Sequence, residues 1–330
     1  MLLGKRWSGC PPHLFLPGMR DERNPTPNMI LSPQQKIVIN ALIPVARIAT
    51  NGSKSEHSFR PLTTTMLVGP SGSGKSWVAR ELAKVMGLPS LVINVETYVV
   101  ISARSEPYSM SSLISWLATL ENGGVLILDE LDKLGAGEDC SWDRHVRLEL
   151  HDICDGIIPI SAKIPGPVED PSWDFPPDHP HEFIAREVLE ERLRNRVMIV
   201  GCGAWQHAWS TNANKLGFSP DTTHRQDAPS NAQILGSIAP ELRQRFRDEV
   251  LMILPMSRGD YYACACEIEK TLKPDIRSAW KLLLGDAIER AINGTLGMRI
   301  FEELMLQSII LSMRQPARQA TQENPCMILE

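Results

Sequence analysis

The stretch that most constrains this chain is residues 63–76, TTTMLVGPSGSGKS. Its spacing, G-x-x-x-x-G-K-[ST], is the signature of a phosphate-binding loop, and it ends at Lys75 and Ser76. Glycines permit the tight turn in which successive N–H groups converge on a phosphate, and the positive end of the following helix adds to the attraction. An apolar run at 64–68 precedes the loop, and a segment with helical spacing follows it. This order of strand, loop and helix predicts a nucleotide-binding site.

The residue types in the loop indicate distinct roles around a bound nucleotide. The Lys75 amino group is expected to reach the β- and γ-phosphates, and the Ser76 hydroxyl to bind Mg²⁺. ATP and Mg²⁺ are therefore the ligands that this motif predicts. The loop residues expected to contact the nucleotide are Gly69, Pro70, Ser71, Gly72, Ser73, Gly74, Lys75, Ser76 and Trp77.

A second motif, GGVLILDE at 123–130, is a continuous apolar run that ends in two acids. Such a run is typical of a parallel strand buried on both faces. Asp129 at the strand end is expected to hold Mg²⁺ through water, and Glu130 to orient and activate the attacking water. Acids at a strand end can also be plain turn residues. Their position downstream of a phosphate-binding loop favours the metal-binding and catalytic roles.

Composition limits the class of protein. A chain of 330 residues suits a larger and a smaller domain, and 43% hydrophobic with 22% charged residues is typical of a soluble globular protein. The net charge is −5 and no long run of Lys or Arg occurs, so nothing global indicates a nucleic-acid surface. The seven cysteines contain no C-x-x-C pair, which favours free thiols in a reducing cytosol over a metal cluster. Neither a signal peptide nor a membrane span is indicated, and we expect a cytoplasmic protein.

Strands alternate with helices up to about residue 255, and only helices follow. This order predicts an α/β fold, a P-loop NTPase parallel sheet sandwiched by helices, with a small all-helical C-terminal lid domain. A helix is expected to start at Ser32 as N-cap with Pro33 in its first turn, and a small hairpin is expected at 157–164. The expected divisions are a flexible extension at 1–28, a large ATPase domain at 29–255 with a proline-rich insert at 161–190, a lid at 256–315 and a tail at 316–330.

The order of these motifs resembles the AAA+ ATPases and, within them, the Clp-type unfoldases. The acid motif continues as DELDKL at 129–134, similar to the D-E-I-D-K of that family. HVRLELHDICDGIIPI at 145–160 looks like the family helix that leads into an inner-channel hairpin, and VMIVGCGAW at 197–205 resembles the strand of the first nucleotide sensor. The likeness covers about residues 29–314, and the phosphate and acid motifs are its most specific parts.

The resemblance implies two further functional arginines. APELRQRF at 239–246 is similar to the family's P-E-[FL]-x-x-R-[LIF] segment, so Arg245 would reach the γ-phosphate held by a neighbouring subunit. Gly297-Met298-Arg299 resembles the G-A-R opening of the second-sensor helix, which would place Arg299 over the same phosphate and make it a nucleotide contact. A ring of identical subunits, expected to be a hexamer, is implied as well. The resulting catalytic set is Lys75, Glu130, Arg245 and Arg299.

The chain departs from the family pattern in several places. The peptide-gripping G-Y-V-G loop is replaced by ETYVVISARSEPYSM at 96–110, where Tyr98 or Tyr108 are candidate substitutes. The predicted sensor strand ends in 201–203, GCG, without Asn, Thr or Ser. Leu216-Gly217-Phe218 resembles the tripeptide that docks a peptidase, although a buried turn is the simpler interpretation. A zinc-binding N-terminal domain is not expected, because residues 1–28 contain a single cysteine.

Three functional hypotheses follow. The first is a Mg²⁺-ATP-hydrolysing AAA+ ring that remodels or unfolds a protein partner. The second is a nucleic-acid motor or loader, as in recombination or mobile-element systems; the missing G-Y-V-G loop favours it, and the acidic net charge and the DELDK motif count against it. The third is a nucleotide-gated assembly switch with slow turnover. The incomplete first sensor suits the switch, but the retained Glu130 argues against it.

Overall fold

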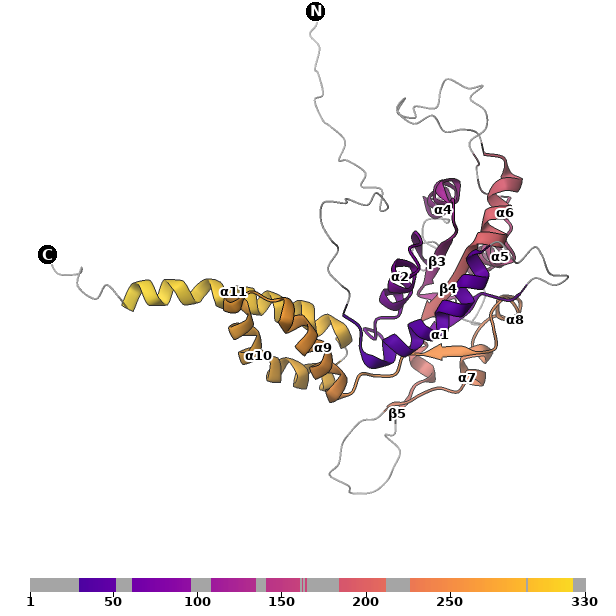
Figure 1. Ribbon diagram of the computed structural model, residues 1–330. Helices are drawn as coiled ribbons and strands as arrows, with labels where there is room; N and C mark the ends of the chain where they lie inside the picture. Colours follow the sequence, from indigo (N-terminus) through magenta and orange to yellow (C-terminus); the bar gives the residue numbers. More distant parts are fainter. Residues whose placement is uncertain are drawn as a thin grey trace, which may run out of the picture.

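The computed structural model describes residues 30–51, 61–95, 108–134, 141–160, 162, 164, 184–211, 226–294 and 296–322. Within them lies one sheet of five strands, all paired in parallel, in the order β2-β3-β4-β1-β7 (Figure 1). Parallel neighbours require crossover connections, and the flanking helices supply them. The strands are β1 (Thr65–Val68), β2 (Ser90–Asn94), β3 (Gly124–Asp129), β4 (Val197–Gly203) and β7 (Val250–Met252).

Helices cover both faces of the sheet. On one face, α1 (Pro33–Thr50) and α2 (Lys75–Val85) share a hydrophobic core with alternate strand residues such as Leu67 and Ile127. The intervening strand residues, such as Met66 and Leu128, join a second core on the other face. The helices of that second core are α4 (Tyr108–Thr119), α5 (Ser141–Asp155), α6 (Arg186–Arg196), α7 (Asn231–Gly236) and α8 (Pro240–Arg243). Burial on both faces explains the continuous apolar runs of the inner strands, and the α/β sandwich predicted from the sequence is confirmed.

The N-terminal helix begins where the sequence places it. The Ser32 hydroxyl accepts a hydrogen bond from the Gln35 backbone N–H at 3.2 Å, and the Gln35 side chain accepts one from the Ser32 N–H at 2.9 Å. Pro33 occupies the first turn, where its missing N–H costs nothing. This capping box satisfies two of the backbone donors that a helix start leaves without partners.

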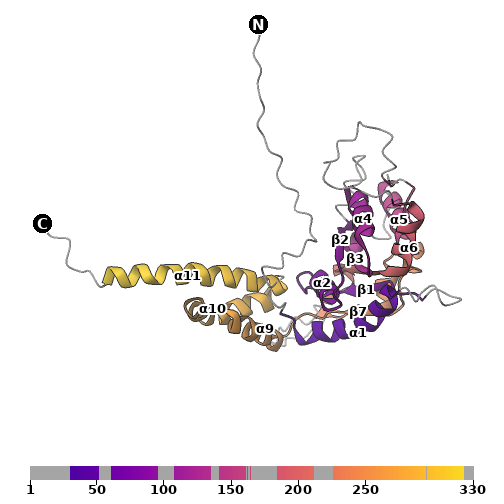
Figure 2. The same cartoon turned by 45° about the horizontal axis from the view of Figure 1, so that its top comes forward.

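The C-terminal region is helical, as predicted, and lies beside the sheet domain (Figure 1). Its helices are α9 (Arg258–Thr271), α10 (Pro274–Asn293) and α11 (Ile300–Gln322), the last preceded by a 3-10 turn, η4 (Gly297–Arg299). Their core is centred on the fully buried Trp280, which stacks on Phe301 with ring centroids 6.2 Å apart. The last helix continues to Gln322, into the segment 316–330 that was expected to be a tail, and it extends beyond its neighbours (Figure 2).

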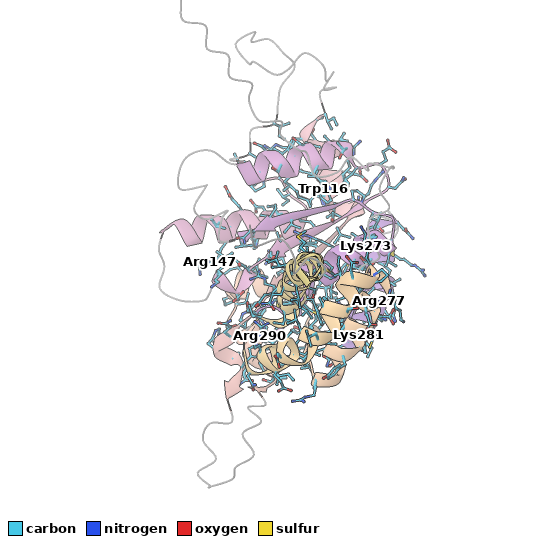
Figure 3. All side chains as sticks on the ribbon, turned by 90° about the vertical axis from the view of Figure 1, so that its left-hand side faces the viewer. Trp116, Arg147, Lys273, Arg277, Lys281 and Arg290 are labelled. Atoms are coloured by element: carbon cyan, nitrogen blue, oxygen red, sulfur yellow. The ribbon has the colours of Figure 1, made fainter. Side chains whose placement is uncertain are left out.

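Ion pairs and carbonyl contacts tie the lid helices together, and their basic members Arg277, Lys281 and Arg290 are labelled in Figure 3. Lys281 of α10 pairs with Glu269 of α9 at 3.0 Å, and Arg277 donates to the Leu272 carbonyl at 2.9 Å. Arg290 of α10 pairs with Glu303 of α11. These basic side chains are therefore engaged within the lid.

One expectation is wrong, namely the small hairpin at 157–164. The described residues of 157–164 contain no strand; instead Arg186 of α6 donates to the carbonyls of Ile158 at 2.6 Å and Ala162 at 3.3 Å. β2 is an edge strand of the sheet and is mostly half-buried. Apart from this sheet, β5 (Ser210–Thr211) pairs antiparallel with β6 (Gln226–Asp227).

Several expectations fall outside the described residues. They are the extension at 1–28, Tyr98, the side chain of Tyr108, the tripeptide 216–218 and most of the insert at 161–190. Within the described part of the chain, no helix combines the length and apolar character needed to cross a membrane. Cys202, Cys264 and Cys266 are free thiols, in line with the cysteine pattern.

Candidate nucleotide site

The phosphate-binding loop lies between β1 and α2, held against the ends of neighbouring strands. Gly69 donates its N–H to the Gly203 carbonyl of β4 at 3.4 Å, and a Cβ on Gly69 would lie 2.5 Å from the Ile253 carbonyl oxygen. Gly72 and Gly74 have φ of 76° and 86°, the left-handed region that glycine adopts without strain. Gln35 of α1 donates to the Ser73 carbonyl at 2.9 Å. Contacts with β4, with Ile253 and with α1 thus hold the loop backbone in place.

α2 begins at Lys75, and the Lys75 side chain turns back over the phosphate-binding loop. Its Nζ donates to the carbonyls of Gly69 at 2.8 Å and Pro70 at 3.0 Å. Burial lowers the pKa of this amino group, and the nearby Cys202 and the carboxylates of Asp129, Asp132 and Glu130 oppose the shift. The ammonium group is therefore partly desolvated beside acidic groups, where phosphate oxygens can replace the loop carbonyls as its partners.

Ser76 and Asp129 are brought together from the two motifs. The Ser76 Oγ donates to Asp129 Oδ2 at 2.6 Å, and the Glu130 N–H donates to Asp129 Oδ1 at 3.1 Å. A hydroxyl and a carboxylate at this separation are oxygen donors of the kind that Mg²⁺ prefers. The Ser73 hydroxyl in the same loop is buried without a hydrogen-bond partner among the described residues. Both observations fit a magnesium-bound phosphate at this place.

Glu130 adopts a left-handed conformation, with φ 60° and ψ 36°. A side chain rarely occupies this region, and here it turns the chain from β3 into η2 (Leu131–Lys133). Glu130 Oε2 accepts a hydrogen bond from Asn94 Nδ2 at 3.1 Å. Asn94 ends β2 and is in register with Asp129 of β3. Asn94 was not among the site residues predicted from the sequence, although its place at the end of the strand beside β3 was the available signal.

The end of β4 is joined to the acid motif. Asp132 accepts hydrogen bonds from the backbone N–H groups of Ala204 at 3.0 Å and Trp205 at 3.2 Å. Trp205 is buried and has a positive φ of 46°. β4 continues to Gly203, and Cys202 within it is fully buried, which raises the pKa of its thiol. Backbone groups, rather than an Asn, Thr or Ser side chain, meet Asp132 at this strand end.

The lid touches the phosphate loop through backbone atoms. The Met298 N–H donates to the Gly72 carbonyl at 2.9 Å. Gly297 has φ 54°, and a Cβ on it would lie 2.3 Å from the Gly72 oxygen, closer than real Cβ contacts allow. Arg299 directly follows this contact and is exposed. The structure therefore places Arg299 next to the phosphate loop.

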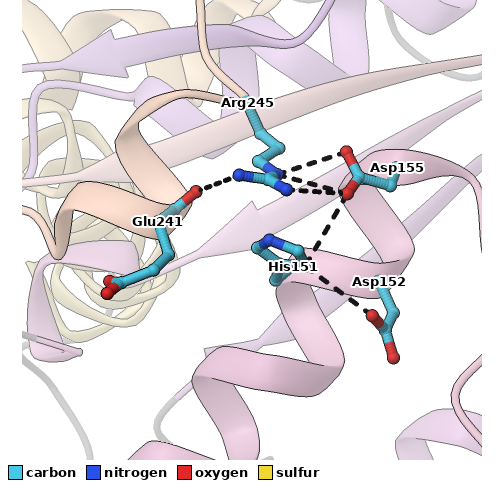
Figure 4. A network of polar contacts seen from close by, with 5 residues as sticks. All are labelled: His151, Asp152, Asp155, Glu241 and Arg245. Carbon is cyan, nitrogen blue, oxygen red and sulfur yellow. Dashed lines mark hydrogen bonds and ion pairs between the residues drawn. The ribbon is translucent and has the colours of Figure 1, made fainter.

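Arg245 lies apart from the other sequence-predicted site residues. Its polar contacts among the described residues are with Asp155 and with the Glu241 carbonyl, and none is with Lys75, Ser76 or Glu130 (Figure 4). Of the remaining loop positions, Ser71 and Trp77 are exposed and Pro70 is half-buried.

The fold and the site together define a nucleotide-binding domain of the P-loop class. Residues 65–156 match the family model described as ATPase family associated with various cellular activities (AAA). The match runs from β1 to the end of α5 and includes both the phosphate loop and the acid motif. It supports an ATPase of the AAA+ class.

Proposed function

We propose that this protein hydrolyses Mg²⁺-ATP as a ring-forming AAA+ ATPase and uses the reaction to remodel or unfold a protein partner. The observation that carries the proposal is the junction of the two motifs, where Ser76 Oγ lies 2.6 Å from Asp129 and Glu130 follows directly. We further propose residues 29–255 as the ATPase domain and 256–315 as the lid.

The chain's own groups supply positioning and electrostatics, which is most of what phosphoryl transfer requires. The loop N–H groups and Lys75 hold the phosphates of ATP. Ser76 and Asp129 would hold Mg²⁺, which when bound neutralises charge on the phosphates. Glu130 orients the attacking water and accepts its proton. Asn94, bonded to Glu130, influences where that carboxylate points.

The position of Arg245 supports a shared site. It makes no polar contact with the phosphate loop of its own chain among the described residues, so it suits a role at a neighbour's nucleotide. A ring places such a residue against the next subunit and makes hydrolysis depend on assembly. Arg299, beside Gly72, would act on the nucleotide of its own subunit.

Two substitutions test the ATPase proposal. Lys75→Ala should abolish ATP binding or turnover, because the phosphates lose their main cationic partner. Glu130→Gln should keep ATP binding, stop hydrolysis and stabilise the assembled ring. Steady-state hydrolysis and size measurements with and without ATP check both. Unchanged turnover in either variant would contradict the assignment of that residue.

The class of cargo is tested by measuring which polymer stimulates ATP hydrolysis. ATP hydrolysis should rise with an unfolded polypeptide and stay at its basal rate with single- or double-stranded DNA. The lid's Lys281 and Arg290 are engaged in ion pairs, which argues against a free basic surface there. Stimulation by DNA alone would instead support the nucleic-acid motor, and very slow turnover under all conditions the assembly switch. Peptidase docking through 216–218 and a cytoplasmic location stay predictions.

A further inference from the structure

Arg245 is held by two acceptors of its own chain (Figure 4). Its Nε and Nη2 donate to the Asp155 carboxylate, at 3.2 Å to Oδ1 and 3.0 Å to Oδ2 respectively. Its Nη1 donates to the Glu241 carbonyl at 2.8 Å. The paired contacts along one edge of the guanidinium are the geometry in which arginine and carboxylate bind most specifically.

Both partners of this pair are fixed by the fold. Asp155 ends α5, and the next residue, Gly156, has φ 77° and would place a Cβ 2.8 Å from Arg194. Arg245 is flanked by Leu242 and Phe246, which are buried in the core of the sheet domain. The ion pair therefore joins the end of α5 to the segment around Arg245, and the core holds both in place. The ion pair also orients a side chain that in solution samples many rotamers.

The pair leaves the arginine able to bind an anion. A guanidinium carries five N–H donors. Within the described part of the chain, the contacts with Asp155 and Glu241 engage one N–H on each nitrogen, which leaves one on Nη1 and one on Nη2. The Asp155 side chain keeps an exposed fraction of 36% and that of Arg245 22%, so the pair lies at the surface. An incoming phosphate can meet the two remaining donors without breaking the pair.

We propose that Asp155 is a positioning residue that orients Arg245 for the nucleotide of the neighbouring subunit. This inference rests on the proposed ring ATPase. Asp155 touches no reacting atom in this scheme; it acts through Arg245, in the subunit that donates the arginine. His151, with Nδ1 3.7 Å from Asp155 and 3.6 Å from Asp152, adjoins the pair.

The first measurement compares Asp155→Asn with Asp152→Asn as a matched control on the same helix. Asp155→Asn should lower kcat for ATP roughly 10- to 30-fold, with KM and thermal stability little changed, because ordering of one long side chain is lost. Asp152→Asn should leave kcat unchanged. In an Arg245→Ala background, Asp155→Asn should cause no further loss. A higher kcat for Asp155→Asn would show that Asp155 restrains Arg245, and would overturn the proposal.

A mixing experiment locates the effect in the donating subunit. Arg245→Ala protein has an intact nucleotide site. Lys75→Ala protein keeps Arg245 but has an inactive nucleotide site. Mixing them should restore activity. Donors that carry Lys75→Ala with Asp155→Asn should restore at least 10-fold less, and donors that carry Lys75→Ala with Asp152→Asn should restore as much as Lys75→Ala alone.

The outcomes separate the two proposals. Equal restoration by the Asp155→Asn donor and the plain donor would overturn the role of Asp155 and leave the shared ring site standing. No restoration by the plain Lys75→Ala donor would overturn the shared site itself, and the positioning role with it.

Discussion

Asn94 ends β2, Glu130 directly follows the neighbouring parallel strand β3, and a hydrogen bond of 3.1 Å joins Asn94 Nδ2 to Glu130 Oε2. The bond engages one oxygen of the carboxylate expected to activate water. Asn94 is therefore placed to restrain the Glu130 carboxylate from activating water before the nucleotide site is complete.

Replacing Asn94 by Ala should raise basal ATP hydrolysis. A hydrogen bond of ordinary net strength, about 0.5–1.5 kcal/mol, corresponds to a rise of about 2- to 10-fold. Steady-state hydrolysis at saturating ATP measures it. Asn195→Ala, at a half-buried position in the last turn of α6, is the control and should leave the rate unchanged. A fall in the rate of the Asn94 variant would mean that the bond orients Glu130 productively.

The motifs whose chemistry lies in contiguous residues could be predicted from the sequence. Lys75 and Ser76 stand in a loop signature, and Asp129 and Glu130 end an apolar strand; the structure brings Ser76 and Asp129 within hydrogen-bond distance. The sheet and helical lid also followed from the order of periodic segments, because a strand buried on both faces needs an unbroken apolar run.

Contacts between residues that only the folded chain brings together could not be predicted from the sequence. Gln35 looks like a capping residue in sequence, yet it also binds the Ser73 carbonyl. The hairpin expected at 157–164 was wrong because Arg186, distant in sequence, takes up the carbonyls that a strand partner would have used. Asp155 gave no local signal, because its partner Arg245 lies 90 residues away in the turn that follows α8.

Gly297→Ala should weaken nucleotide binding by at least about 10-fold. The new Cβ would meet the Gly72 oxygen at 2.3 Å, and the residue would keep a positive φ that costs alanine roughly 1–2 kcal/mol. The lid must then shift from the phosphate loop and take Arg299 with it. Titration with a fluorescent ATP analogue measures the affinity. Gly285→Ala in α10 is the matched control, because nothing lies within 4 Å of its added Cβ.

Ser76→Ala should raise the magnesium concentration needed for half-maximal hydrolysis. The variant removes one of the two oxygen donors at the motif junction, while the phosphate loop backbone stays in place. Ser76→Thr keeps the hydroxyl and should behave like the parent protein. The role assigned to Ser76 fails if the alanine variant shows the same magnesium dependence as the threonine variant.

The lowered pKa of Lys75 predicts how pH changes the stability of the nucleotide-free protein. Between the folded value and the ordinary 10.5, the unfolded chain binds more protons than the folded one, so stability rises with pH in that window. The cost of burying the ammonium is fully present below the folded pKa and disappears above the unfolded pKa. Lys75→Met carries no such cost.

The melting temperature of Lys75→Met minus that of the parent should therefore fall as the pH is raised from about 7 to about 10. Subtracting the two proteins cancels the titration of all other groups. ATP should raise the melting temperature of the parent protein only, and this effect should weaken at alkaline pH as the ammonium loses its charge. Lys75→Arg is the control, because a guanidinium does not titrate in this range. A difference independent of pH would show that Lys75 is not desolvated in the folded state.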